Sequence, residues 1–427
     1  MCLGHESSGI IVDVGPSLSS SSSAATEKWK VGDRVAIEAG VPCSVASQFN
    51  EHGSTFLSSN AGKANGTSSS TSSCSSSECA RCNEGRYNLC PQMRFASSAK
   101  TFPHIDGTLQ KFINWPAALI HRVPENVSLL AASIVEPLSV VLQGFERARF
   151  AASVNPSCSS NQSNNKDKTS VKGNDKSVLI LGAGAVGLLA CVTAKALGAQ
   201  FVAAVDIDEG RLAFAKRMEW VQDTFQLPLP SASTTMENSV SSSTDQKVQR
   251  KVEDEQSVGA AQKQADTLRS YFTSRYQPAT SAVSSKSGLS VSELAAGFDL
   301  VLECTGVPSC VQLSILATRP GGRVALIGMG HPIQSAFPIG AAALREVDII
   351  GVFRYANVYP LALQMLADGR IPQTIDERGI ENLVSHRFEL HQTADAFETM
   401  QNGKSKDGKG VVKVFIVDQH LLDADAT

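Results

Sequence analysis

The sequence predicts an α/β fold in which buried strands alternate with helices. Apolar runs that predict strands end in glycine or acidic turns at SVLILGAGAVG (177–187), FVAAVDID (201–208), FDLVLECTG (298–306) and GGRVALIGM (321–329). Between them, residues 186–199 and a run from Val311 have the apolar spacing of helices. Because strands that alternate with helices pair in parallel, we expect a parallel sheet with helical crossovers.

Shorter elements flank this sheet. Two β-prone runs at 6–15 and 31–39 are bounded by glycine and indicate a small all-β module. The tail from Tyr359 to Thr427 contains a helix, a short strand (HRFEL), another helix and a final strand (VVKVFIV).

Serine-rich stretches interrupt these elements. They cover 17–28, 44–78, 153–175 and 228–292. Such polar segments bury too little apolar surface to offset the entropy of ordering, so we interpret them as disordered loops. The alternative is that some of them are mispredicted or unspliced coding sequence.

Composition excludes several classes of protein. The 427 residues carry a formal net charge of −3, which disfavours nucleic acid or an anionic membrane as the main partner. No apolar run reaches the ~18 residues of a transmembrane helix, and the opening MCLGHESSGI lacks the pattern of a signal peptide. We therefore expect a soluble, cytoplasmic protein.

A glycine pattern predicts a dinucleotide site. Gly182, Gly184 and Gly187 follow a strand and open a helix, as in G-x-G-x-x-G turns that cradle a pyrophosphate. Asp206 ends the next strand, where a carboxylate can bind the adenosine ribose and repel a 2′-phosphate. The pattern thus favours NAD over NADP. Arg211 either lies over the adenine or is a solvated helix residue.

Clustered cysteines predict a structural zinc site. Cys79, Cys82 and Cys90 have tight thiolate spacing, and a closed zinc site needs a fourth thiolate. Cys43 and Cys74 compete for this place. We favour Cys43, because it follows a strand whereas Cys74 lies inside a serine tract. Free cysteines in a loop are the alternative reading.

A second set of polar residues suits a catalytic zinc. His5 and Glu6 lie near the start, and Glu136 lies inside an apolar, helix-like stretch where a carboxylate is costly to bury without a partner. Imidazole nitrogen and carboxylate oxygen are ligands of catalytic zinc. A lone histidine such as His5 is more often an ordinary surface or core residue.

Eleven motifs together resemble one family. They are GHESSGIIVDVG, KVGDRVAIEAGVPC, ECARCNEGRYNLCP, DGTLQKF, VEPLSV, GAGAVG, VDIDEGRLAFAK, DLVLECTG, GGRVALIGMG, REVDIIGVFRYANVYPLAL and LVSHRF with FETM. In this order they resemble the zinc-dependent medium-chain dehydrogenases, and most of all their polyol branch of sorbitol (L-iditol) and L-arabinitol dehydrogenases. The resemblance covers nearly all of the chain outside the serine-rich stretches.

The resemblance implies roles for individual residues. It implies His5, Glu6 and Glu136 at a catalytic zinc, and Cys43, Cys79, Cys82 and Cys90 at a structural zinc. It implies an NAD site at Gly182, Gly184, Val186, Gly187, Asp206, Arg211, Ile327, Gly328, Met329, Val352, Phe353 and Arg354. Glu136, Arg354 and Tyr355 would be catalytic or substrate-side residues, and the VFRY motif favours a polyol over a simple alcohol.

The implied fold is a Rossmann domain inserted in a β-rich, GroES-like catalytic domain. We expect the catalytic domain at 1–145 and 351–427, with an insertion at 44–78, and the Rossmann domain at 146–350, with insertions at 153–175 and 228–292. Family members carry further strands, a substrate-side tyrosine and the cysteine ligand of the catalytic zinc ahead of the GHE motif, so the N-terminal part is expected to be incomplete. Cys2 does not match that cysteine's position.

The implied activity is the oxidation of a secondary hydroxyl of sorbitol, L-arabinitol or xylitol to the ketose, with zinc as Lewis acid and NAD as hydride acceptor. The family also implies a homo-oligomer, a dimer or tetramer. The alternatives are an NAD-binding remnant without catalytic zinc, and a threonine or alcohol dehydrogenase of the same family.

Overall fold

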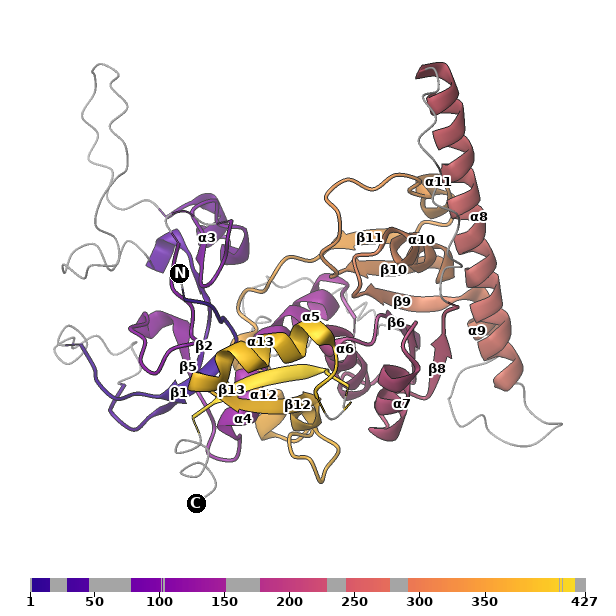
Figure 1. The fold of residues 1–427 in the computed structure, drawn as a ribbon. Coiled ribbons are helices and arrows are strands. Elements are labelled where there is room, and N and C mark those ends of the chain that lie inside the picture. The colour runs from indigo at the N-terminus through magenta and orange to yellow at the C-terminus, as the bar shows by residue number, and fades with distance from the viewer. Residues whose placement is uncertain are drawn as a thin grey trace, which may run out of the picture. The chain divides into compact units, whose positions relative to one another are not determined.

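The computed structural model describes residues 2–15, 29–45, 78–100, 102, 104–150, 177–228, 243–276, 291–406, 408 and 410–418. The chain divides into two compact units (Figure 1). Unit 1 comprises Met1–Glu136, Phe353–Leu363 and Ile416–Thr427, and unit 2 comprises Pro137–Val352 and Gln364–Phe415. None of the helices that these residues form is long and apolar enough to cross a membrane.

Unit 1 is built on a small antiparallel sheet in the order β1-β2-β5. Its elements are β1 (Ser7–Ile10), β2 (Arg34–Ile37), β3 (Gly40–Val41), α3 (Ala80–Asn83), β4 (Arg94–Phe95), β5 (Ile120–Arg122), α4 (Leu129–Ser133) and the 3₁₀ turns Tyr87–Leu89 and Ala117–Leu119. The Ser128 hydroxyl accepts a hydrogen bond from the Ala131 N–H and so caps α4. The Ser8 hydroxyl donates to the Leu129 carbonyl at 2.6 Å, which fixes α4 to β1.

Unit 2 contains a six-stranded parallel sheet in the order β11-β10-β9-β6-β7-β8. Its strands are β6 (Ser177–Leu181), β7 (Phe201–Asp206), β8 (Asp223–Gln226), β9 (Phe298–Glu303), β10 (Thr318–Leu326) and β11 (Asp348–Gly351). The chain order reverses between β6 and β9, as in the doubly wound dinucleotide-binding fold. The parallel α/β sheet predicted from the sequence is confirmed.

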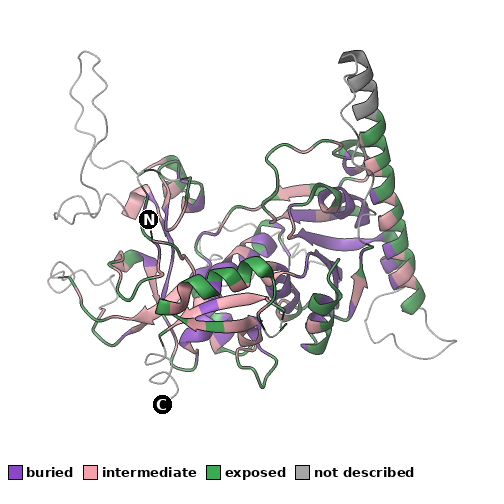
Figure 2. Cartoon of the chain, in the orientation of Figure 1, coloured by how far each residue is buried: buried purple, intermediate pink, exposed green. Residues whose placement is uncertain are grey.

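Helices cover this sheet. They are α6 (Ala185–Ala196), α7 (Glu209–Arg217), α8 (Ser243–Arg275), α9 (Val291–Ala296), α10 (Pro308–Ala317) and α11 (Ile339–Ala343). Strands β6, β7 and β9 are buried along their whole length, and β9 is seen in purple in Figure 2. Strands covered on both faces explain the continuous apolar runs in the sequence.

Helix α5 (Val135–Arg147) precedes the parallel sheet in the chain. The order predicted for the tail is confirmed by α12 (Tyr359–Ala367), β12 (Val384–Glu389), α13 (Thr393–Asn402) and β13 (Lys413–Val417), with the 3₁₀ turns Ile380–Leu383 and Leu390–Gln392 between them. Helix α13 ends at Gly403, which adopts a left-handed conformation with φ of 65°.

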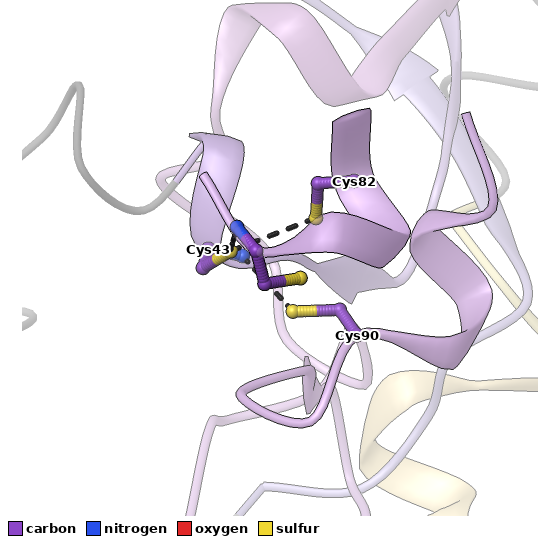
Figure 3. Close-up of side chains that lie close together, drawn as sticks. Cys43, Cys82 and Cys90 are labelled. Carbon is purple, nitrogen blue, oxygen red and sulfur yellow. Dashed lines mark hydrogen bonds between the residues drawn. The ribbon is translucent and has the colours of Figure 1, made fainter. Parts of the chain in front are cut away.

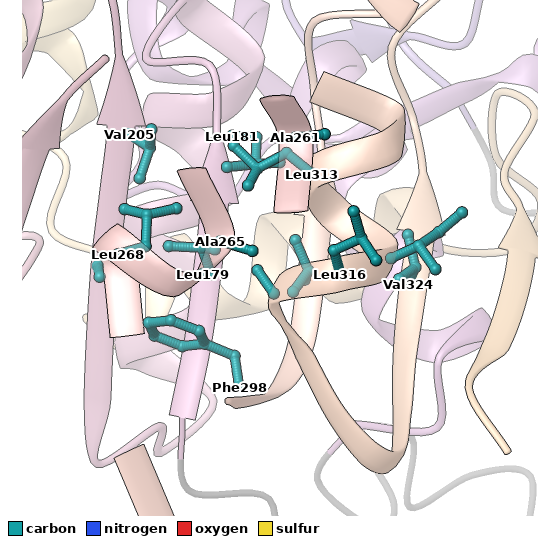
Figure 4. Packing of buried hydrophobic residues seen from close by; sticks show 14 of the residues in the cluster. Leu179, Leu181, Val205, Ala261, Ala265, Leu268, Phe298, Leu313, Leu316 and Val324 are labelled. Carbon is teal, nitrogen blue, oxygen red and sulfur yellow. The ribbon is translucent and has the colours of Figure 1, made fainter. Parts of the chain in front are cut away.

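The disordered loop expected across 228–292 is wrong for residues 243–276, which include the long helix α8. Ala261, Ala265, Leu268 and Phe272 recur at helical spacing and are at most 2% exposed. They pack against the sheet and α10 in the core cluster of Figure 4. The serine- and glutamine-rich sequence on both sides of these four residues makes the average composition polar, which is why the sequence predicted a loop here. The other expected loops, apart from Ser44, Val45 and Glu78, lie outside the described residues.

Candidate active site

The glycine turn lies at the carboxyl end of β6, beside the point where the strand order reverses. Gly182 has φ of +95°, a conformation that favours glycine. A Cβ on Gly187 would lie 1.7 Å from the Gly182 carbonyl oxygen, so only glycine lets α6 approach the strand this closely. A Cβ on Gly184 would lie more than 4 Å from every described residue outside its own stretch of chain, so this position is open toward the space where a pyrophosphate would bind. Val186 follows in the first turn of α6 and is half-buried.

Asp206 braces this turn from the end of β7. Its carboxylate accepts hydrogen bonds from the Ala183 N–H at 2.6 Å and from the Asp208 N–H at 2.8 Å. The side chain of Asp208 caps α7 by accepting from the Arg211 N–H at 3.0 Å. Arg211 itself is exposed in the first turn of this helix. The carboxylate of Asp206 therefore fixes the turn as well as placing negative charge beside it.

Two further loops lie at the same end of the sheet. The buried carboxylate of Glu303 accepts hydrogen bonds from the Thr305 and Gly306 N–H groups, at 2.8 and 3.0 Å. A Cβ on Gly330 would lie 1.8 Å from the Gly306 carbonyl oxygen, and one on Gly328 would lie 2.2 Å from the Gly306 nitrogen. The loops after β9 and β10 are therefore in direct backbone contact.

The other predicted cofactor residues differ in exposure. Ile327 is buried and lies against Gly144, where an added Cβ would be 2.9 Å from its Cδ1. Met329 is 89% exposed. Val352 is half-buried and its N–H donates to the Leu326 carbonyl at 3.1 Å. Phe353 is exposed and begins a segment of unit 1, so it is not part of the same unit as these three.

Four cysteines meet in unit 1, and Figure 3 labels three of them, Cys43, Cys82 and Cys90. The sulfur atoms of Cys43, Cys79, Cys82 and Cys90 all lie within 4.8 Å of one another, with Cys43 and Cys82 at 3.6 Å. Burial raises the pKa of Cys90 to about 12, whereas a hydrogen bond from the Cys82 backbone lowers the pKa of Cys79 to about 7. The geometry fits a tetrahedral zinc, which would favour the thiolate at each sulfur.

A histidine and two carboxylates form the second group. One ligand atom from each of His5, Glu6 and Glu136 lies within 4.8 Å of the others. His5 and Glu6 directly precede β1, while Glu136 is 6% exposed in the first turn of α5. This donor set fits a catalytic zinc with three protein ligands. The Cys2 thiol is not part of the group, because it donates to the Leu109 carbonyl at 3.2 Å.

The DGTLQ motif holds the chain ahead of His5. The Gly107 and Leu109 N–H groups donate to the carbonyls of Cys2 and Leu3, each at 2.8 Å. A Cβ on Gly107 would lie 2.1 Å from the Gly4 carbonyl oxygen, so the contact requires glycine. Sequence reasoning used this motif for the resemblance but did not connect it to the metal group.

Arg354 lies at this group. Its guanidinium stacks on the Phe95 ring at 3.7 Å, and the Phe95 ring lies 5.5 Å from the imidazole of His5. Burial lowers the pKa of Arg354, and the nearby Tyr355 and Glu136 partly offset this effect. Arg354 has φ of 50°, which is uncommon for a side-chain-bearing residue and often marks a functional position.

Tyr355 is 3% exposed, and its pKa is raised well above the usual value, mainly by burial and then by the neighbouring Tyr359 and Glu136. The structure thus brings Arg354 and Tyr355 to the metal group of unit 1. Phe95 had no signal in the sequence, because an isolated phenylalanine after a serine-rich stretch predicts only a core position.

The chain matches known families along its length. Residues 1–76 match the alcohol dehydrogenase GroES-like domain, and residues 278–368 match the zinc-binding dehydrogenase family. A sorbitol dehydrogenase from Arabidopsis thaliana is 30% identical over 410 residues, which are 95% of this chain and 78% of that protein. A probable D-xylulose reductase A from Neosartorya fischeri is 31% identical over 405 residues, with the same coverage.

Solved structures share the fold. L-idonate 5-dehydrogenase from Escherichia coli superposes with a TM-score of 0.61 at 19% identity and covers 98% of this chain and 82% of its own. Galactitol-1-phosphate dehydrogenase from the same organism superposes with a TM-score of 0.59 at 21% identity, over 97% and 84%.

Fold and site define a zinc-dependent oxidoreductase that acts on CH–OH groups with a nicotinamide cofactor. The chain belongs to the zinc-dependent medium-chain dehydrogenases, in the polyol branch that includes the sorbitol dehydrogenases and D-xylulose reductases. The family and fold inferred from the sequence motifs are confirmed.

Proposed function

We propose that this chain oxidises a secondary hydroxyl of a polyol such as sorbitol, xylitol or L-arabinitol to the ketose, with NAD as hydride acceptor. The main support for this proposal is that His5, Glu6 and Glu136 bring their ligand atoms to one metal-sized space. The guanidinium of Arg354 stacks nearby, on the Phe95 ring. Relatives named sorbitol dehydrogenase and D-xylulose reductase support a polyol as substrate.

The three donors would hold the catalytic zinc, and Cys43, Cys79, Cys82 and Cys90 the structural zinc. A catalytic zinc acts as a Lewis acid that lowers the pKa of a bound hydroxyl. Glu136, nearly buried at the start of α5, is placed to accept the released proton directly or through water. The guanidinium of Arg354 and the hydroxyl of Tyr355 would hydrogen-bond the remaining substrate hydroxyls and orient the reacting carbon.

The proposal includes the nucleotide and the assembly. Gly182, Gly184 and Gly187 would bind the pyrophosphate, and Asp206 disfavours a 2′-phosphate, so NAD is preferred over NADP. We place the catalytic domain at 1–145 and 351–427 and the Rossmann domain at 146–350. A cytoplasmic dimer or tetramer completes the proposal, and light scattering coupled to size-exclusion chromatography tests the oligomeric state.

The decisive experiment is NADH formation by the purified, zinc-loaded chain. Sorbitol, xylitol and L-arabinitol are compared with ethanol and L-threonine, each with NAD and with NADP. We expect turnover of a polyol with NAD, and loss of turnover in Glu136→Gln with unchanged NAD binding. Nucleotide binding without turnover of any polyol would instead indicate a non-catalytic NAD-binding protein.

A further inference from the structure

Unit 1 also contains a buried polar cluster. Glu38, whose side chain is 4% exposed, pairs with the His121 imidazole at 2.8 Å. The His121 ring stacks on the ring of Tyr359 with centroids 4.9 Å apart. Glu38 and His121 are separated by 83 residues in the sequence, and neither contributes a ligand atom to the metal groups found among the described residues.

Tyr359 is the centre of this cluster. It is 1% exposed, and its hydroxyl donates a hydrogen bond to the Ile37 carbonyl at 3.0 Å. Its ring lies 5.2 Å from that of Tyr355. Burial raises its pKa well above the usual value, and the charges of Glu136, Glu38 and Glu6 add to this shift. Because a carbonyl oxygen can only accept, the Tyr359 hydroxyl is the donor in its bond to Ile37.

The bond to Ile37 connects Tyr359 to the metal ligands. Ile37 ends β2 and pairs with Ser7, the first residue of β1, which directly follows Glu6. A shift of Ile37 would therefore be passed through the strand pair to His5 and Glu6.

The same tyrosine is connected to the substrate-side residues. Tyr359 begins α12, four residues after Tyr355, and the intervening turn is held by the Asn357 N–H, which donates to the Tyr87 hydroxyl at 2.7 Å. The Asn88 side chain donates to the Phe353 carbonyl at 2.8 Å, just ahead of Arg354. The Tyr359 hydroxyl thus contacts the strand pair that follows the metal ligands, while its backbone continues the loop that carries Arg354.

We propose that Tyr359 is a positioning residue, supported by the Glu38–His121 pair, which fixes the metal ligands His5 and Glu6 relative to Arg354 and Tyr355. Its hydroxyl anchors β2 while its backbone anchors the substrate-side loop. The effect on substrate binding rests on the proposed function, whereas the effect on metal retention does not.

The test is Tyr359→Phe in the full chain, which removes only the hydroxyl. The rate of zinc release is measured with a chromogenic chelator. The kinetic phase of release that is seen in the unmodified chain but not in Glu136→Gln is assigned to zinc held by His5, Glu6 and Glu136. Loss of one hydrogen bond predicts roughly three- to tenfold faster release in this phase, with the cysteine-bound zinc unaffected. For polyol turnover, KM for the polyol should rise by a similar factor and KM for NAD should not change.

Tyr276→Phe is the matched control. The Tyr276 hydroxyl also donates to a backbone carbonyl, that of Gln222 at 3.4 Å, but lies in unit 2. Its zinc release and both KM values should equal those of the unmodified chain. Unchanged release in Tyr359→Phe overturns the proposal, as does a drop in Tm and kcat with no change in either release or KM. Faster release in a chain that oxidises no polyol would support the positioning role and contradict the proposed function.

Discussion

Replacing Gly184 by alanine separates nucleotide binding from folding. Gly184 has φ of −74° and caps α6, and the described part of the chain leaves an added Cβ without a neighbour within 4 Å beyond its own local backbone. Alanine has accessible backbone angles there, and its weaker capping is offset by a less flexible unfolded chain. We therefore expect the free energy of unfolding to change by less than about 0.5 kcal/mol.

The affinity for the nucleotide, in contrast to the stability, should fall strongly in Gly184→Ala. The new methyl group would occupy the space through which a pyrophosphate approaches the backbone at the start of α6. Pushing the phosphate away by about one bond length loses at least one charge-assisted hydrogen bond, worth about 1.5–3 kcal/mol. The Kd for NAD should therefore rise roughly 10- to 150-fold.

Gly187→Ala provides the contrast. Its Cβ would lie 1.7 Å from the Gly182 carbonyl oxygen, so α6 must move away from the turn. Overpacking of this kind costs about 1–3 kcal/mol, so stability and affinity should fall together. Calorimetric titration with NAD and urea unfolding measure the two quantities. Gly184→Ala with unchanged NAD affinity would show that this turn is not the pyrophosphate site.

Three other substitutions test separate parts of the structure. Asp206→Ser should shift the ratio of kcat/KM for NAD over NADP at least about tenfold toward NADP, because the charge that repels a 2′-phosphate is gone. Phe272→Ala should lower the free energy of unfolding by about 3–5 kcal/mol in urea titrations, because this fully buried ring contacts Phe201 and Phe298 in aromatic pairs. Cys90→Ser should leave one zinc per chain instead of two in elemental analysis, since a closed zinc site requires four ligands.

Each of these has a contradicting result. Unchanged cofactor selectivity would remove Asp206 from the ribose site and leave it the bracing role seen in the turn. The exposed Lys263 on the same helix is the control for Phe272, and equal effects of the two alanine substitutions would contradict the packing of α8. Two zincs retained in Cys90→Ser would exclude this cysteine as a ligand.

Local patterns predicted the parallel sheet and the glycine turn between β6 and α6, because strand, turn and helix signals there are contiguous in the sequence. Helix α8 was missed for a physical reason. Its average composition is polar, and the buried apolar side chains that the structure describes in it are Ala261, Ala265, Leu268 and Phe272. The composition of the whole serine-rich stretch predicts a loop. The helical spacing of a few apolar side chains is what allows this segment to pack on the sheet as a helix.

The site could be predicted only where the chemistry lies in short motifs. The GHE pair and the cysteine spacing are visible in the sequence. The stacking of Arg354 on Phe95 and the pairing of Glu38 with His121 join residues that are distant in the chain. Such contacts depend on how β4, β5, the residue after β2 and the segment ahead of α12 are arranged in three dimensions, which no local pattern encodes.

The cysteine cluster also fixes the two ends of the segment between Cys43 and Cys79. The Cys79 N–H donates to the Cys43 sulfur at 3.4 Å, so the two ends of this segment are adjacent. A metal that binds both cysteines closes the chain there, and the entropy of loop closure grows only slowly with length. Because the cysteine cluster, and not the length of the intervening chain, sets the distance between these ends, a linker of another length could join Cys43 to Cys79 while the four cysteines stay together.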